Sequence, residues 1–227
     1  MLPLRDEYPT LRTPFVNYIL ITINILVYIW QFFVGQSNPG LVYQFALVPA
    51  QVSGGLSPDD LLHIFTSMFM HGGLAHIGGN MLYLWIFGDN IEDAMGHGRY
   101  LFFYLLGGVL ASVAHIVTSP GSTVPTVGAS GAIAAVLGAY LILYPRARVL
   151  ALVMFGFFIR ITMIPAIIVL GLWFILQLFQ GVLTLGGPDV GGVAFWAHIG
   201  GFVVGLFLAR AFAQNRTYAD YIRSRTF

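Results

Sequence analysis

The chain of 227 residues contains no cysteine and no lysine, and acidic and basic residues together make up only 8% of it. The lack of cysteine excludes disulfide bonds and metal sites built from thiolates. So little charge is unusual for a soluble domain. The net charge of only +1 gives no support for a nucleic-acid partner, and we expect none.

Hydrophobic residues take the place of the missing charge, at 58% of the chain and a mean hydropathy of +0.83. Uncharged apolar runs recur, several of them close to the ~20 residues of helix that cross a bilayer. We therefore predict an all-α membrane protein, a single-domain bundle of six transmembrane helices. The first run lacks a small-residue cleavage site, so we expect it to be retained. The predicted helices are 14–34, 74–95, 99–117, 127–144, 162–183 and 191–212, between polar tails at 1–13 and 213–227.

Two parts of this bundle are unusual, the first outer loop and the fourth helix with the connection before it. The first outer loop, at 35–73, is long and holds apolar pieces that we predict to lie at the membrane interface. The fourth helix, 127–144, provides only ~27 Å of the ~30 Å needed to span. Residues 119–126 before it hold two prolines and cannot be regular helix. Irregular backbone at membrane depth is tolerated only against protein or a wet cavity, so we expect a cavity open to water there.

The arginines predict the orientation of the bundle. All ten lie in the two tails, in the 2–3 and 4–5 connections, or at the adjoining helix ends. The outer connections, roughly 35–73, 118–126 and 184–190, hold none. Basic residues concentrate on the cytosolic side of membrane proteins. We therefore predict a multi-pass membrane protein with both termini in the cytosol, and we expect the membrane to be a prokaryotic cytoplasmic membrane.

Four polar residues are predicted to share one layer in the outer half of the bilayer: His76, Asn80, Ser130 and His198. Ser130 lies sixteen residues before the next arginine, or ~24 Å along a helix. His198 lies twelve before its own cytosolic arginine, and Asn80 twelve before Glu92, each ~18 Å. His76 is one helical turn from Asn80, on the same face.

Small residues offer a reason why two of these helices should touch. The fourth helix carries Gly131, Ala135 and Gly138, and the sixth carries Gly201 and Gly205. Small residues at such spacings let membrane helices approach backbone to backbone. We therefore expect the fourth and sixth helices to pack closely.

The chemistry of this layer is that of a serine hydrolase. A serine hydroxyl is a weak nucleophile until a base takes its proton, and His198 can do this for Ser130. The chain has no carboxylate in the same layer, so we predict a Ser-His dyad and not a triad. Asn80, His76 and the backbone N–H of Ser130 are the candidate donors for an oxyanion hole.

A metal site formed by His71, His76 and His198 is an alternative reading. It would leave Ser130 and Asn80 without a role, whereas polar residues inside membrane helices usually have one. The dyad is therefore the preferred hypothesis.

The combination of motifs resembles the rhomboid family of intramembrane serine proteases, in its basic six-helix form. The motifs are His76-Ile-Gly-Gly-Asn80, Gly128-Ala-Ser130-Gly131, Ala197-His198-Ile-Gly-Gly201, and Glu92 with Gly96. The resemblance covers nearly the whole chain. It implies Ser130 as nucleophile, His198 as base, and His76 and Asn80 in the oxyanion hole. It also implies an active site in a water-filled cavity open to the outer side, with no metal or other cofactor. The implied substrates are membrane-anchored proteins, single-pass ones among them.

Substrate entry is predicted to pass the fifth helix at Trp173 and Phe174, together with a glycine-rich loop that includes Gly186 and Gly187. A flexible loop at this place can act as a lid.

The chain departs from the family pattern at two places, one in the first outer loop and one at a position that contacts the catalytic histidine in some relatives. Leu62-His63 stands where several relatives carry Trp-Arg, and Ala134 stands where some carry an aromatic residue stacked on the catalytic histidine. The role of His71 is open. A catalytically silent relative that binds membrane proteins, and more distantly a small-solute transporter, are the alternative functions.

Overall fold

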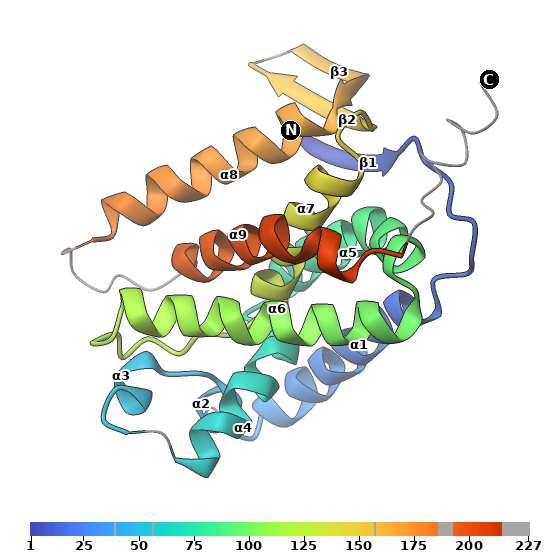
Figure 1. The fold of residues 1–227 in the computed structure, drawn as a ribbon. Helices are drawn as coiled ribbons and strands as arrows, with labels where there is room; N and C mark the ends of the chain where they lie inside the picture. The colour runs from blue at the N-terminus through green and yellow to red at the C-terminus, as the bar shows by residue number, and fades with distance from the viewer. Residues whose placement is uncertain (39, 56, 157, 186–192, 215–227) are drawn as a thin grey trace, which may run out of the picture.

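A computed structural model describes all residues except 39, 56, 157, 186–192 and 215–227 (Figure 1). The described chain is mostly helical, with one small sheet. Its elements are β1 Leu2–Asp6, α1 Phe15–Gly35, α2 Leu41–Phe45, α3 Pro49–Val52, α4 Pro58–Thr66, the 3-10 helix η1 Ser67–Phe69, α5 Leu74–Met95, α6 His97–Thr118, α7 Ser130–Leu143, β2 Arg148–Phe155, β3 Phe158–Pro165, α8 Ala166–Leu183 and α9 Phe195–Phe212.

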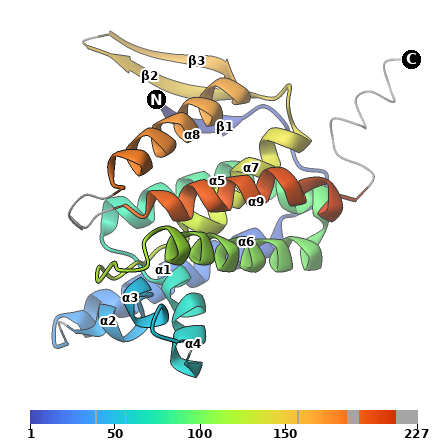
Figure 2. The same cartoon turned by 60° about the vertical axis from the view of Figure 1, so that its left-hand side comes forward.

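Helix α7 forms the centre of the bundle. Every residue from Gly131 to Tyr140 is buried, and α5, α6, α8 and α9 all pack on it. Helices α6 and α9 run side by side, while α1 and α8 lie on opposite sides of the bundle (Figures 1 and 2). A helix that is apolar on all its faces is stable only when surrounded by other protein or lipid.

The close approach of the fourth and sixth predicted helices is confirmed. A Cβ added to Gly201 would overlap the carbonyl oxygen of Gly131, and one added to Gly205 would overlap that of Ala135. A Cβ at Gly138 would likewise meet the backbone of α9. The two backbones therefore touch along more than one turn of α7 and α9.

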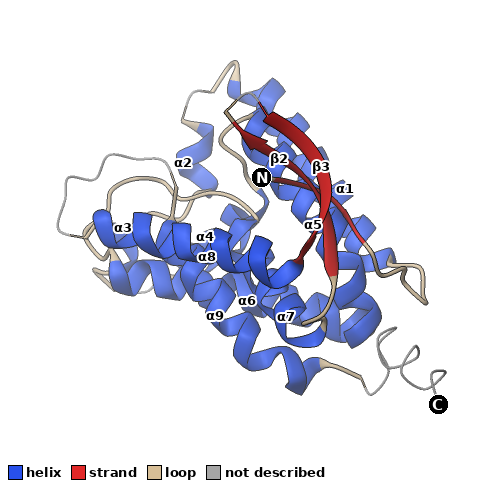
Figure 3. Ribbon diagram, turned by 90° about the horizontal axis from the view of Figure 1, so that it is seen from above, coloured by secondary structure: helices blue, strands red, loops and turns tan. Residues whose placement is uncertain are grey.

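The prediction of an all-α fold is wrong in one region. Residues of the predicted fourth connection form a β-hairpin, β2–β3, and the N-terminal strand β1 pairs antiparallel with β2 (Figure 3). The hairpin is rich in Val, Ile and Phe, which favour strands, and Gly156 turns the chain with φ of +57°. The predicted helix at 162–183 therefore begins later, at Ala166, because 162–165 belong to β3.

The other predicted helices agree with the structure to within a few residues. The fourth is shorter than predicted, since residues 127–129 are not helical and α7 has 14 residues. Among the described residues, four helices are long and apolar enough to cross a membrane: α1, α6, α8 and α9. Helix α7 is apolar but shorter. Helix α5 has 22 residues, but three acidic side chains lie near its end. The chain is thus a multi-pass membrane protein.

One of these acidic residues has a structural function. The Glu92 carboxylate is buried and accepts the backbone N–H groups of Val16 and Asn17, at 2.9 and 2.6 Å. These groups belong to the first turn of α1, whose N–H groups have no partner within the helix. A negative charge also suits the positive end of a helix dipole. Glu92 therefore anchors α1 to α5.

We expect Glu92→Gln to lower the free energy of unfolding by about 2 kcal/mol, because a charged hydrogen-bond acceptor is replaced by a group with only one oxygen. Thermal unfolding in detergent measures the change. Glu7→Gln is the matched control: its exposed side chain accepts one backbone N–H, that of Arg148 at 2.8 Å, and a glutamine oxygen can accept the same bond. This change should alter stability by less than about 0.5 kcal/mol. Equal stabilities of the two variants would contradict the anchoring function of Glu92.

Candidate active site

Ser130 is the first residue of α7, and an irregular segment leads into it. Residues 119–129 are not helical, as predicted for 119–126. Gly128 has φ of +129°, a conformation that favours glycine. A Cβ at this position would also lie only 2.7 Å from Nε2 of His76. Glycine is therefore required both by the turn that exposes Ser130 and by the neighbouring histidine.

The structure brings Ser130 and His198 into direct contact. Nε2 of His198 lies 2.7 Å from Oγ of Ser130, although the two residues are 68 positions apart. Helix α9 positions the histidine through its close contact with α7. The other ring nitrogen, Nδ1, lies 2.6 Å from Oε1 of Gln177 on α8. The imidazole is thus held from both sides, and His198 is only 9% exposed.

His76 and Asn80 lie on α5, opposite the Gly128 turn. The position of a Cβ on Gly128 is 2.7 Å from the His76 ring and 3.6 Å from the Asn80 amide nitrogen. That amide nitrogen is buried, and it has no hydrogen-bond partner in the described part of the chain. The side chains of His76 and Asn80 therefore both face the backbone next to Ser130.

All four residues of the predicted layer line one cavity of about 1210 Å³. Other parts of its wall come from the irregular segment before α7, including Ser119, Ser122 and Thr126. His115 of α6 also lines the cavity and places Nε2 3.0 Å from the hydroxyl of Thr126. The non-helical backbone thus lines a cavity, which is where it is tolerated in a membrane protein.

His71 lies just outside the dyad, in the connection before α5. Its backbone is held on both sides by Gln31 of α1, whose amide accepts from the N–H and donates to the carbonyl at 3.0 and 2.6 Å. Its ring packs edge-on against His76, with centroids 5.2 Å apart. Burial lowers the pKa of His71 to about 4, so the ring is neutral at pH 7. His71, His76 and His198 do not form a metal-binding group among the described residues.

The residues predicted for the gate differ in what they contact. The Trp173 ring lies 5.8 Å from the His198 ring, and Phe174 stacks on Phe202 of α9 at 4.6 Å. Both side chains therefore pack on α9 in this structure. Gly186 and Gly187 lie outside the described residues. The function of all four as a gate stays a prediction.

Two residues that contact histidines of the site, Gln31 and Gln177, are not predicted from the sequence. Gln31 shares the apolar helix α1 with Asn17 and Asn24, and Gln177 shares α8 with Gln180. Polar residues in membrane helices are functional hypotheses by default. That signal was available for both. The absence of an aromatic residue at Ala134 also required another means to orient His198.

Comparisons with known proteins give the family of the chain. Residues 58–215 match the Rhomboid domain. The chain is 32% identical to the rhomboid protease GluP of Bacillus subtilis over 200 residues, which are 87% of this chain and 35% of GluP. It is 27% identical to the putative rhomboid protease YdcA of the same species over 128 residues, 56% of this chain and 61% of YdcA. Identity to the mitochondrial presenilin-associated rhomboid-like protein A of Danio rerio is 35% over 104 residues, 45% of this chain and 27% of that protein.

Fold and cavity together define a multi-pass membrane protein whose central helix presents a serine to a histidine. The matched domain covers well over half of the chain, and the chain belongs to the rhomboid family. It spans about a third of the length of GluP.

Proposed function

We propose that this protein is an intramembrane serine endopeptidase that cuts membrane-anchored proteins in or near their transmembrane segments. The observation that carries the proposal is the 2.7 Å distance between Ser130 Oγ and His198 Nε2 inside the cavity. A nucleophile and a base within hydrogen-bonding distance are the signature of nucleophilic catalysis.

The reaction then proceeds in two halves. Ser130 Oγ attacks the peptide carbonyl carbon while His198 Nε2 takes the hydroxyl proton, and the carbonyl oxygen becomes an oxyanion. His76, Asn80 and the Ser130 backbone N–H are the donors that stabilise it. The protonated His198 gives its proton to the departing amine, leaving an acyl-enzyme. A water molecule, deprotonated by His198, attacks the ester, and the serine is released with its proton restored.

The substrate must expose its backbone before this chemistry can occur. In an intact helix each backbone carbonyl accepts a hydrogen bond from the N–H four residues further along. Such a carbonyl is not accessible to attack by Ser130. Good substrates are therefore membrane proteins with Gly, Pro or polar residues near the outer end of a span, and a small residue before the cut. The protein works within a lipid bilayer with both termini in the cytosol, and the cavity opens to the outer side.

A catalytically silent family member is the second candidate function. A silent member would bind membrane proteins without cutting them and has no need for an aligned serine and histidine. The short distance between Ser130 and His198 favours the protease, because only catalysis requires that contact.

A fluorophosphonate probe separates the two functions, because it labels only an activated serine. The purified chain in detergent should be labelled at Ser130. It should also cut at least one member of a panel of single-pass membrane proteins. Absence of both labelling and cleavage would favour the silent alternative.

We expect Asn80→Ala to reduce kcat by about 10²- to 10³-fold, the usual effect of removing one oxyanion-hole donor. Residual activity should remain, because His76 and the Ser130 backbone still donate. Turnover of a cleaved substrate measures the change, with Asn24→Ala on α1, away from the cavity lining, as a control for loss of a buried asparagine. Unchanged turnover of Asn80→Ala would remove Asn80 from the oxyanion hole.

A further inference from the structure

Helix α8 turns one narrow face towards the bundle. Leu170 and Gly181 on this face are buried, and Trp173 and Gln177 are half-buried. These residues follow a helical repeat of three to four positions. The opposite face, which includes Leu176 and Phe179, is exposed as expected for contact with lipid. Gln177 is the polar residue of the inward face, and its side-chain oxygen contacts the imidazole of His198.

We propose that Gln177 is a positioning residue that fixes the tautomer of His198, by accepting a hydrogen bond from Nδ1–H through its side-chain oxygen. The inference rests on the proposed function for its catalytic meaning. The contact itself is independent of that function, since it is a hydrogen-bonding distance between α8 and α9.

The tautomer follows from the two contacts of the ring. A neutral imidazole has one N–H, so one ring nitrogen donates and the other accepts. Nε2 must accept the proton of Ser130 if His198 is to act as a base, and therefore Nδ1 must carry the hydrogen. The group opposite Nδ1 must then be an acceptor, and the Gln177 oxygen at 2.6 Å is one. In the opposite tautomer, Nδ1 and the amide oxygen would both be acceptors and would repel each other.

A neutral amide suits this position better than a carboxylate does at rest. A buried ionised carboxylate costs several kcal/mol in a low-dielectric site unless it is paired. An amide oxygen provides the acceptor without that cost. Trp173, one turn before Gln177, lies with its ring tilted 31° to the His198 ring and limits its rotation. Gln177 and Trp173 together hold the imidazole ring of His198 in one orientation.

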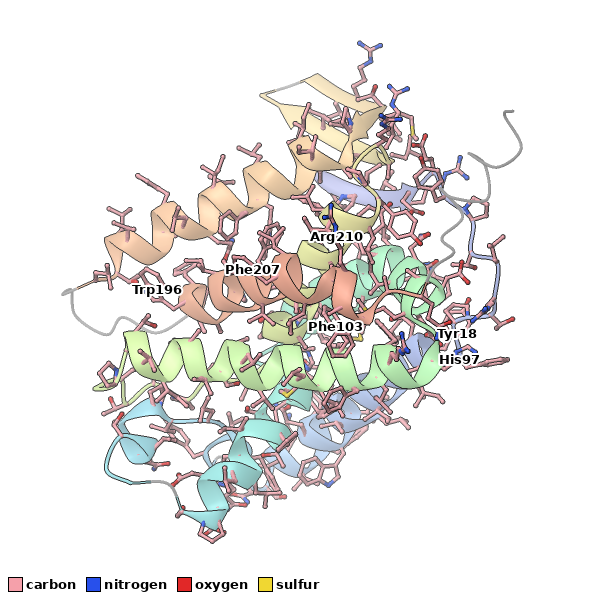
Figure 4. The ribbon with its side chains drawn as sticks, in the orientation of Figure 1. Tyr18, His97, Phe103, Trp196, Phe207 and Arg210 are labelled. Carbon is pink, nitrogen blue, oxygen red and sulfur yellow. The ribbon has the colours of Figure 1, made fainter. Side chains whose placement is uncertain are left out.

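The position of α8 is therefore coupled to the state of the dyad. Near the end of α8, Gly181 allows close contact with α9: a Cβ there would lie 3.0 Å from Ile199 and 3.6 Å from Trp196. Figure 4 labels Trp196 at the start of α9, beside the end of α8. A movement of α8 away from α9 would withdraw Gln177 and release His198 from its productive tautomer.

Three variants test the inference. Gln177→Leu removes the acceptor with little change in volume, Gln177→Glu restores an oxygen acceptor, and Gln180→Leu changes an exposed glutamine of the same helix. We expect Gln177→Leu to lower the fluorophosphonate labelling rate of Ser130 by about 10²-fold, the scale of a lost general base. In substrate cleavage, kcat should fall with KM unchanged. The labelling rate of Gln177→Glu should stay within about tenfold of the parent rate. Gln180→Leu should be labelled at the parent rate.

Nitrogen-15 NMR of the histidine rings gives a second readout that needs no activity. In the Ser130→Ala background, the His198 ring should carry its hydrogen on Nδ1. Adding Gln177→Leu should convert it to a mixture of tautomers.

Each outcome decides the inference. Parent-like labelling of Gln177→Leu, or a His198 ring protonated on Nε2, would overturn it. A Gln177→Glu variant that keeps the His198 hydrogen on Nδ1 but is as slow as Gln177→Leu would do the same, because the acceptor would then be in place without restoring the rate. If the parent is never labelled but its His198 carries the Nδ1 hydrogen, the protease proposal fails and the positioning function of Gln177 stands.

Discussion

If the proposed function holds, replacing Ser130 with alanine is expected to reduce peptide cleavage by about 10⁶-fold, to below detection, as loss of the nucleophile does in subtilisin. No other hydroxyl is held at 2.7 Å from His198 in the described residues. The proposed oxyanion donors would remain, but without an attacking hydroxyl no oxyanion would form for them to stabilise. Cleavage of a single-pass substrate, followed by gel electrophoresis, measures the effect.

The Ser130→Ala fold should survive. The hydroxyl takes part in one side-chain hydrogen bond, to His198, and its loss costs about 1 kcal/mol. Alanine also has the highest helix propensity and suits the first turn of α7. Ser112→Ala, on α6 in the wall of the same cavity, is the control and should keep full activity. More than a trace of cleavage by Ser130→Ala would disprove the dyad.

The site could be anticipated from the sequence because a helix has a fixed rise. Counting residues from Ser130 and His198 to the next arginines placed both at similar depth, and the structure brings both to one cavity. Depth in the membrane does not say whether two helices touch. The glycines of α7 and α9 indicate that these two do. A serine and a histidine at similar depth on two touching helices must lie close to each other.

The hairpin and Gln177 were missed for two different physical reasons. An apolar stretch is compatible with a strand or with the start of a membrane helix, and β2–β3 directly precedes α8. Its pairing with β1 joins residues about 145 positions apart, which no local pattern encodes. For Gln177, the sequence gives its depth but not the rotation of α8 about its own axis. That rotation decides whether the amide faces His198 or lipid.

The second large effect is expected for Gly205→Ala, a change of one methyl group. A Cβ on Gly205 would overlap the carbonyl oxygen of Ala135 and lie 2.8 Å from its carbonyl carbon. These are backbone atoms of α7, so no flexible side chain can move aside. Helices α7 and α9 would have to separate. Ser130 and His198 lie on these two helices, and their 2.7 Å contact would lengthen as the helices part.

Two opposing terms decide the sign of the stability change. Gly→Ala in a helix gains up to about 1 kcal/mol of propensity. Overpacking typically costs about 1–3 kcal/mol, and more where backbone must move, so the clash should win at Gly205. In α8, Gly171 has nothing within 4 Å of an added Cβ, and Gly171→Ala therefore shows the propensity term alone. We expect Gly205→Ala to unfold at a lower temperature than Gly171→Ala in detergent and to lose nearly all fluorophosphonate labelling. If Gly205→Ala is as stable and as reactive as Gly171→Ala, backbone contact between α7 and α9 does not hold the dyad together.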